Sequence, residues 1–298
     1  HTSACGVTAY LGDLLGPEYL NSVFVCEPIG HLVTRSIVEP NGVTLSARRA
    51  RPKADFLASS DTWFRPASLA NGPDGALYLA DMYRLWVEHP KFLPPEIAVK
   101  LDWRAGDDRG RIYRIVPKES KPRSFTPPQN IKQTVALLED DNAWRQFLGQ
   151  RLLVRQKLEE SIPEIRLILK GGKSATSRLH SLWTLDGIGA LKGSDVLTAL
   201  DDPDPHVRRD AVKLASRWLP EDAVFAKVGQ RVSDDDPRVR FQVALTLGES
   251  DRVAATRLLV TLALRDGRDS WFASGLLTSV GKRAGDVLTA LVEDKSFA

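Results

Sequence analysis

The sequence is poor in sulfur-containing residues, with two cysteines and one methionine among 298 residues. The cysteines, Cys5 and Cys26, belong to no C-x-x-C-H or zinc-binding pattern, so this chain predicts neither haem attachment nor structural zinc. They are compatible with a disulfide between neighbouring strands in an oxidising compartment. They are equally compatible with two buried, reduced thiols. The sequence leaves both alternatives open.

Long apolar runs and an excess of one charge are also missing. No run approaches the roughly 18 apolar residues that a membrane helix needs, so we expect no membrane-spanning segment. Residues 1–130 carry 16 basic against 14 acidic side chains, and residues 131–298 carry 25 against 24. This balance argues against nucleic acid or an anionic membrane as a partner. The opening "HTSACG" has no secretory-signal pattern and is typical of a processed product or a fragment.

The common catalytic signatures are absent as well. The sequence contains no G-x-S-x-G elbow, and neither cysteine stands beside a histidine. It contains no phosphate-binding loop and no dinucleotide fingerprint. These absences give no support to nucleophilic catalysis or nucleotide binding.

Residues 1–118 contain short apolar segments bounded by turn residues, which predict β-strands at 22–28, 31–40, 43–49, 76–81 and 110–117. The runs 23–26 and 77–80 do not alternate with polar residues, which is typical of strands covered on both faces. Antiparallel strands of this kind favour β-propeller blades, about two of them. A β-sandwich is the alternative, although its strands should alternate more cleanly.

The pattern changes after a polar, proline-rich segment at 119–130, which we expect to be a linker. From 131 to 298 the chain is helical and repeats itself: 202–218 and 234–250 superpose with an offset of 32. Each of these segments begins with an Asp-Pro pair, the pattern of an N-cap followed by proline at the first helical position. About five units of 30 to 33 residues predict an α-solenoid of short HEAT-like repeats.

An arginine recurs once in most of these repeats. Arg208 corresponds to Arg240, Arg178 and Arg145 stand at similar spacing before them, and Phe272 follows at the same spacing. The arginines could line a concave surface that binds an acidic partner. Alternatively, each could pair with an acid of the neighbouring repeat, which the nearly neutral charge of this half favours. In either case a repeat array is an extended binding surface.

Polar and aromatic residues follow the two clearest strands of the first half. Glu27 follows 23–26 and Asp81 follows 77–80, and equivalent propeller strands end at the same rim. The loop 58–66 should open at that rim too. The candidate site therefore comprises Glu27, His31, Asp61, Trp63, Arg65, Asp81, Tyr83 and Arg84, with His89 at its border.

These side chains suit recognition of a polar ligand. Arginine holds a carboxylate or phosphate, an aromatic ring offers an apolar face to a sugar or flat cofactor, and carboxylates suit Ca²⁺. The alternative is that each residue only forms a turn or a surface ion pair. Gly106-Asp107-Asp108 also resembles a short acidic metal loop, but it lacks EF-hand spacing. We favour an ion-pair network there, with Arg104, Arg109 and Arg111.

A string of motifs across both halves resembles one family. The segments "FVCEPIGHLV", "DFLASSDTWFRP", "GPDGALYLADMYR" and "LDWRAGDDRGRIYRI", followed by HEAT-like repeats, are similar to the "membrane-bound dehydrogenase domain" proteins of planctomycete-type bacteria. The resemblance implies an exported, periplasmic protein. Its six-bladed propeller would be similar to quinone-dependent sugar dehydrogenases, and this chain would contain the last two blades. A c-type cytochrome domain often accompanies such proteins.

The resemblance also implies a chemistry for the full-length protein. Pyrroloquinoline quinone and Ca²⁺ would oxidise a sugar-like alcohol, with Asp61, Arg65, Asp81 and Arg84 as cofactor or substrate contacts. The histidine that accepts the substrate proton lies in an earlier blade, so this chain alone would be inactive. His31 replaces the asparagine usual at its position.

Two functional hypotheses follow. The chain is a fragment of a quinoprotein-like dehydrogenase that passes electrons to a c-type haem domain, or it is a non-catalytic glycan- or protein-binding propeller with a HEAT-repeat scaffold.

Overall fold

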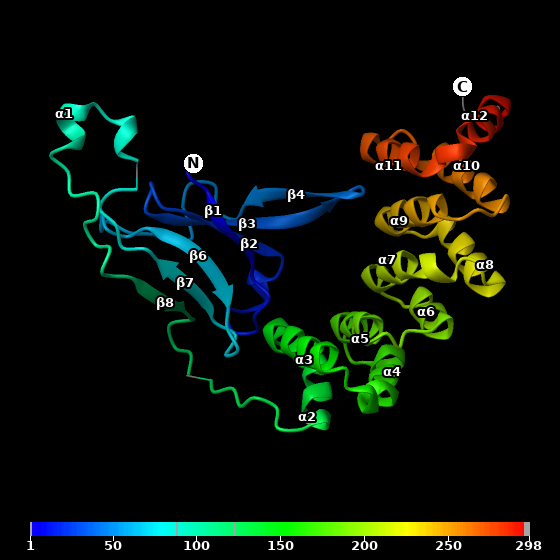
Figure 1. Cartoon of the computed structure of the whole chain (residues 1–298), viewed down its shortest axis with the longest axis horizontal. Coiled ribbons are helices and arrows are strands. Elements are labelled where there is room, and N and C mark those ends of the chain that lie inside the picture. Colours follow the sequence, from blue (N-terminus) through cyan, green and yellow to red (C-terminus); the bar gives the residue numbers. More distant parts are fainter. Residues whose placement is uncertain (1, 88, 122, 295–298) are drawn as a thin grey trace. The chain divides into compact units, whose positions relative to one another are not determined.

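The computed structural model describes residues 2–87, 89–121 and 123–294, which form two compact units (Figure 1). The first unit comprises His1–Glu39, Ser46–Pro127 and Asp141–Trp144, and the second comprises Pro40–Leu45, Pro128–Asp140 and Arg145–Ala298. The chain first holds antiparallel sheets and then a helical array. This order agrees with the expected fold class.

Two sheets make up the first unit. The first contains β1 (Cys5–Ala9), β2 (Ser22–Glu27), β3 (Leu32–Asn41) and β4 (Thr44–Arg49) in sequence order, with β5 (Leu57–Ala58) paired to β3. The second contains β6 (Pro66–Asn71), β7 (Leu77–Asp81) and β8 (Arg111–Ile115). Both have the meander topology expected of blades, and the described strands do not close into a barrel. Short helices lie at Pro17–Tyr19, Pro90–Phe92 and Pro95–Ala98 (α1).

The two sheets share an apolar core because β6 packs against β1 and β2. Phe24 and Cys26 of β2 and Leu77 and Leu79 of β7 are fully buried in it. The residues between them are half-buried or exposed. The expectation that β2 and β7 are covered on both faces is therefore wrong. The side chains alternate across each sheet, and the core lies on one face.

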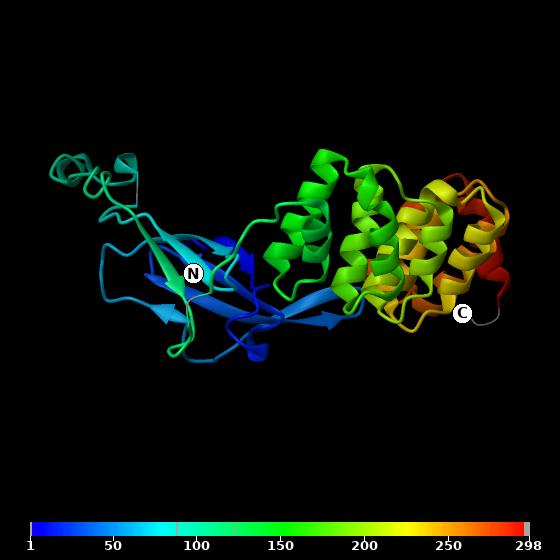
Figure 2. The same ribbon diagram turned by 90° about the horizontal axis from the view of Figure 1, so that it is seen from below.

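The helical unit has two layers of helices (Figures 1 and 2). The inner layer, on the concave side of the arc, contains α3 (Ala143–Gln156), α5 (Ala175–Ile188), α7 (Pro205–Leu214), α9 (Pro237–Gly248) and α11 (Ser270–Val280). The outer layer contains α4 (Ile162–Gly171), α6 (Gly193–Leu200), α8 (Asp222–Gln230), α10 (Ala254–Asp266) and α12 (Ala284–Glu293). The array begins with α2 (Ile131–Ala136), and 3₁₀ turns occur at Leu137–Glu139, Glu159–Ser161, Ala215–Trp218, Arg231–Ser233 and Gly281–Arg283.

Aliphatic side chains hold the two layers together, and one continuous core runs through the array. From α5 onward the inner helices pack against one another in order: α5 on α7, α7 on α9 and α9 on α11. This nearest-neighbour packing defines a solenoid. The expectation of a helical solenoid after the sheets is therefore confirmed.

The inner helices begin at equivalent N-caps. Ser174, Asp204, Asp236 and Asp269 each accept a hydrogen bond from a backbone N–H in the first turn of their helix. The fourth residue after each of the first three N-caps is an arginine: Arg178, Arg208 and Arg240. On α11 the same count gives Ala273, so the expected match of Phe272 to the arginines is wrong by one residue. Phe272 is instead equivalent to the buried Val239.

The expected match of Arg145 is also wrong by one residue. Asn142 accepts a hydrogen bond from Trp144 N, as Asp204 does from His206 N, so the position equivalent to Arg208 in α3 is Gln146. Gln146 is buried and donates to Leu138 O and Thr176 Oγ1. An amide side chain thus replaces the guanidinium at the first inner helix.

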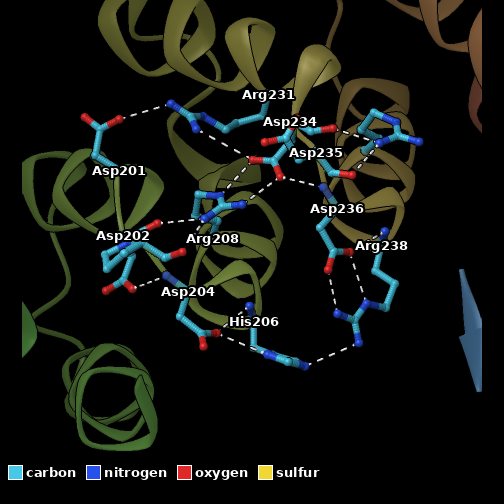
Figure 3. Close-up of polar contacts among 12 residues, drawn as sticks. Asp201, Asp202, Asp204, His206, Arg208, Arg231, Asp234, Asp235, Asp236 and Arg238 are labelled. Atoms are coloured by element: carbon cyan, nitrogen blue, oxygen red, sulfur yellow. Dashed lines mark hydrogen bonds and ion pairs between the residues drawn. The ribbon is translucent and has the colours of Figure 1, made fainter. Parts of the chain in front are cut away.

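The three arginines form an internal ladder, and Figure 3 shows Arg208 with Asp234 and Asp202. Arg208 donates from Nε and Nη2 to the two carboxylate oxygens of Asp234, at 2.7 and 2.8 Å. Its Nη1 donates to Asp202 O at 2.9 Å, while the Asp202 carboxylate accepts the same forked contact from Arg178. Arg240 repeats this arrangement with Asp266 and with Asp234 O. The interpretation of the arginine row as an internal ladder is confirmed.

Ionisation of the ladder is strongly favoured. Hydrogen bonds that the guanidinium groups donate to the aspartates raise the pKa of Arg178, Arg208 and Arg240. Burial opposes ionisation of Asp234, but Arg208, the backbone N–H of Asp236 and Arg231 together outweigh it and hold the pKa of that carboxyl below its usual value. The pairs therefore stay charged at neutral pH.

None of the helices in the described residues combines the length and the apolar character needed to cross a bilayer.

Replacing Arg208 with methionine should lower the free energy of unfolding of the array by roughly 3–5 kcal/mol, because it removes the forked partner of the buried Asp234 and leaves only the longer, 3.6 Å contact with Arg231. Urea unfolding measures this, and the double variant Arg208→Met/Asp234→Leu should recover much of the loss. The control is Asp222→Asn, which breaks the exposed pair with Arg252 and should cost about 1 kcal/mol or less. Equal losses in the two single variants would contradict a structural role for the ladder.

Candidate functional site

Arg111, at the start of β8, organises the edge of the second sheet. Its Nε donates to Asp81 Oδ2 at 2.8 Å, and its Nη2 donates to Asp61 Oδ2 at 3.0 Å. The other oxygen of Asp81 accepts from the backbone N–H groups of Arg65 and Tyr83. Asp81 is buried, so all of its charge is compensated by the protein.

Asp61 remains ionised for related reasons. The backbone N–H of Trp63 and the guanidinium of Arg111 lower the pKa of the Asp61 carboxyl, and His31 contributes. Burial disfavours the charge of Arg111, but the two aspartates outweigh it and raise the pKa of Arg111. An acid–base–acid bridge thus joins the loop before β6 to the ends of β7 and β8.

Aromatic rings cover one side of this bridge. Trp63 and Tyr83 are stacked with ring centroids 5.2 Å apart, and the Arg111 guanidinium lies 4.3 Å from the Tyr83 centroid. Tyr83 has a positive φ of 52°, and Gly106 has a φ of 86°. A side chain at Gly106 would collide with Tyr83 O, so only glycine lets this loop close against the aromatic pair.

Arg65 is a structural tie. It is buried, and its three guanidinium nitrogens donate to the carbonyls of Arg84, Pro28 and Leu85 at 2.8, 2.9 and 2.6 Å. It thereby joins the loop after β2 to the loop after β7. The ends of these strands, at Glu27 and Asp81, lie at one common edge, as the sequence predicted.

Arg84 also serves the backbone. Its Nη1 donates to the carbonyls of Gly106, Tyr83 and Met82. The hydrogen bonds of Arg65 and Arg84 go to backbone carbonyls, whereas a ligand-binding arginine would keep donors for its ligand. The hypothesis that they contact a cofactor or substrate is not supported by this geometry.

Glu27 lies apart from the Arg111 bridge. Its Oε1 accepts from Thr2 N at 2.9 Å and from Ser3 N at 3.0 Å, and its Oε2 accepts from Gly30 N. Burial opposes ionisation, but these hydrogen bonds outweigh it and lower the pKa of Glu27 to about 2. Glu27 therefore anchors the N-terminal residues to the turn after β2.

The two histidines of the prediction lie in different surroundings. His31, at a positive φ of 56°, forms a hydrogen bond from Nδ1 to Phe64 O at 2.9 Å and so lies beside the Asp61 loop. His89 caps the short helix Pro90–Phe92 and contacts the ring of Phe92. The edge cluster therefore includes His31, while the described contacts of His89 are local.

The acidic loop before β8 has the ion pairs that we favoured, with one exception. Arg104 pairs with Asp107, and Arg109 lies 3.8 Å from Asp108. Arg111 turns to Asp61 and Asp81 instead. In the described ranges no three acidic, imidazole or thiol side chains converge as a metal site requires. The carboxylates of Asp61 and Asp81 both accept hydrogen bonds from Arg111.

The two cysteines are direct cross-strand partners on β1 and β2. Both are nevertheless free thiols in this structure, and Cys5 Sγ is directed to Pro66 O at 3.8 Å. Burial, followed by the neighbouring Cys5, raises the pKa of Cys26 to about 12. The structure thus shows the reduced alternative. Because the two cysteines are cross-strand partners, a disulfide between them stays a prediction.

The helical unit exposes a second candidate surface, which we call the inner-helix face. It consists of the fifth and ninth residues after the N-caps of α3, α5, α7 and α9, all half-exposed or exposed: Phe147, Leu179, Arg209, Phe241, Arg151, Trp183, Lys213 and Leu245. Adjacent members contact across helices: Lys213 Nζ lies 5.6 Å from the Trp183 ring centroid, and Trp183 Nε1 donates to Asp210 at 3.1 Å. The sequence reasoning missed this face, although the same periodicity that locates the core also locates it.

Two family models match parts of the chain. Residues 1–119 match a domain of unknown function (DUF7133), and residues 193–276 match HEAT repeats. No curated protein matches it. HEAT repeats suggest a protein-interaction scaffold, and the matched range runs from α6 into α11. The identity as a planctomycete dehydrogenase-domain protein stays a prediction.

Lowering the pH should destabilise the first unit through Glu27. A depressed carboxyl pKa contributes stability above the ordinary value of 4.5, and this contribution is lost as the pH falls towards 2. The loss should reach roughly 3 kcal/mol, and Glu27→Gln should remove this part of the pH dependence. Urea unfolding at a series of pH values, read from amide exchange in β2, tests this. Parallel pH profiles for the two proteins would refute it.

Replacing Arg111 with lysine should break the bridge between Asp61 and Asp81, because one ammonium group cannot contact both carboxylates as the guanidinium does. The pKa of Asp61 should rise towards its ordinary value, and the fluorescence of Trp63 should change as Tyr83 loses its cation. Carboxyl titration by NMR measures the first effect. Arg109→Lys, in the same loop but outside the bridge, is the matched control, and an unchanged Asp61 pKa in Arg111→Lys would contradict the assignment.

Proposed function

We propose that this chain is a non-catalytic binding module in which the inner-helix face receives a partner protein. The observation that carries the proposal is the continuous row of aromatic, aliphatic and basic side chains along that face. Phe147 is 54% exposed, whereas Leu179, Trp183 and Phe241 are half-buried and also pack against the core. Large apolar side chains grouped on a surface mark interaction sites.

The ladder contacts argue against the recurring arginines as the surface that binds the partner. Arg178, Arg208 and Arg240 have their donors occupied by aspartates and carbonyls, so they are poor candidates for binding an acidic partner. The basic residues of the inner-helix face, such as Arg151 and Lys213, are exposed. The face therefore fits a protein segment with apolar and acidic side chains.

The dehydrogenase hypothesis remains the alternative. It would make the edge cluster of Asp61, Trp63 and Tyr83 part of a sugar or quinone site, and it would give the array a c-type haem domain as its partner. The stacked rings favour ligand binding at this edge. Two observations argue against it. Arg111 binds the carboxylates of Asp61 and Asp81, and Arg65 donates its hydrogen bonds to backbone carbonyls. We therefore place the binding function in the helices.

Chemical crosslinking in extracts of the source cells tests the proposal. Phe147→Ser and Lys213→Glu each change an exposed residue of the inner-helix face, and both should reduce recovery of the partner at least about fivefold, in keeping with the loss of interface contacts. The matched controls are Leu167→Ser and Lys170→Glu, at exposed positions of the outer helix α4. They should retain the partner. Equal recovery with all four variants would overturn the proposal.

A further inference from the structure

A small pocket in the first unit is lined by residues that neither the Arg111 bridge nor the inner-helix face uses. It lies where the short helix Pro17–Tyr19, β3 and the loop between β4 and β5 meet, and its volume is about 90 Å³. One water molecule requires roughly 10–15 Å³ of such space, so the pocket has room for a ligand of several atoms. Its lining consists of Tyr19, Arg35, Ala50, Arg51, Ala54 and Phe56.

Two aromatic rings form a fixed wall of this pocket. The rings of Tyr19 and Phe56 meet edge to face with their centroids 6.1 Å apart, and both pack against the buried core of the sheets. The backbone N–H of Phe56 donates to Val33 O at 3.0 Å, which ties the loop to β3. Ala50 and Ala54 have short side chains that leave the pocket open.

Arg35 is held in the pocket lining by contacts that leave part of its guanidinium unused. The guanidinium carbon lies 4.0 Å from the Tyr19 ring centroid. Its Nε donates to Ser22 Oγ at 2.9 Å, and its Nη2 donates to Glu18 O. Among the residues that the structure describes, Nη1 has no hydrogen-bond partner and no carboxylate pairs with Arg35. The cation is thus fixed in place without an anionic partner.

A second uncompensated cation comes from the segment "RRARPK" at the end of β4, which contains four basic side chains and no acidic one. Arg48 pairs with Glu39, and Arg49 pairs with Asp55. Arg51 is exposed at the pocket and makes no hydrogen bond or ion pair within the described part of the chain. Two guanidinium groups without a carboxylate therefore line one small space.

The acidic side chains of the segments around the pocket do not compensate these cations. Glu39 and Asp55 are held by the two arginines of the same segment, as described above. The carboxylate of Glu18 lies over Gly16, where an added Cβ would come within 2.6 Å of its Oε2. The pocket therefore carries a net positive charge.

These features together suit an organic carboxylate. A guanidinium donates charge-assisted hydrogen bonds to a carboxylate or a phosphate. The aromatic wall adds a preference for an anion with an apolar part, because inorganic phosphate has no apolar surface to bury against the rings. A volume of about 90 Å³ limits what the pocket encloses to a small molecule.

We propose that this pocket binds a small organic carboxylate, with Arg35 and Arg51 as its anion-binding donors and Phe56 as its apolar contact. The carboxylate oxygens accept hydrogen bonds from Arg35 Nη1 and from the Arg51 guanidinium. The short side chain of Ala54 leaves room for the attached apolar group. The site lies within the first unit and shares no residue with the inner-helix face, so it adds small-molecule binding to the proposed protein-binding function.

Isothermal titration calorimetry of the full chain with benzoate tests the proposal. Benzoate should bind saturably, and acetate should bind more weakly because it offers less apolar surface to the rings. Inorganic phosphate should compete no better than acetate. Arg51→Gln should weaken benzoate binding about tenfold or more, the loss expected for a charge-assisted hydrogen bond. Ala54→Leu fills the pocket without changing its charge and should weaken binding to a similar extent.

Lys53→Gln is the matched control, since it removes an equal charge from the same loop at an exposed side chain outside the pocket lining. It should bind benzoate like the wild type. Residues 51, 53 and 54 are all exposed, so the three variants should fold, which urea unfolding verifies.

Benzoate binding that is lost in Arg51→Gln and Ala54→Leu and kept in Lys53→Gln supports the proposal. A wild-type protein without saturable benzoate binding overturns it. Equal losses in Arg51→Gln and Lys53→Gln, or tighter binding of phosphate than of benzoate, overturn it as well. Partner recovery through the inner-helix face does not depend on these outcomes, so the two proposals fail separately.

Discussion

The helical array depends on one contact made repeatedly, the forked pair between an inner-helix arginine and the aspartate of the next repeat. Its geometry makes the pairs continuous. The Asp234 carboxylate receives Arg208, while the carbonyl of the same residue receives Arg240. Each loop is therefore held from both sides, and the distance between neighbouring inner helices is fixed by the reach of a guanidinium. Burying charge is costly, and the bidentate geometry with additional carbonyl contacts offsets that cost.

Arginine has a comparable role in the sheet unit, with a different set of partners. Arg111 links two aspartates from separate loops, and Arg65 links three carbonyls. In both units the planar guanidinium, with its several donors, fixes loops whose backbone carbonyls lack backbone hydrogen-bond partners. The inner-helix face, by contrast, combines aromatic and aliphatic side chains with basic ones that make no ladder pair. This division explains why the most conspicuous charged residues of the sequence are structural.

Local sequence patterns were sufficient to predict much of the fold. The array, its period and its ladder follow from residues within one repeat and the next. The register failed at α3 and α11, where the Asp-Pro start is absent and the alignment relied on Arg145 and Phe272. β1 and β6 escaped prediction because "CGVTA" and "PASLAN" are small, polar or proline-containing. The edge acids were found from their strand ends, but Arg111 was given the wrong partners because its contacts span 30 and 50 residues.

The continuity of the ladder has a consequence for how such an array changes length. Asp204 and Asp236 are both N-caps followed by proline, and each stands two residues after a ladder aspartate. Excision of residues 205–236 would join Asp204 directly to Pro237. Arg240 would then find the Asp202 carbonyl where it now finds that of Asp234, while Asp202 kept Arg178. The array can thus lose or gain a whole unit without leaving a ladder charge unmatched, whereas a cut within a unit would break two ladder pairs.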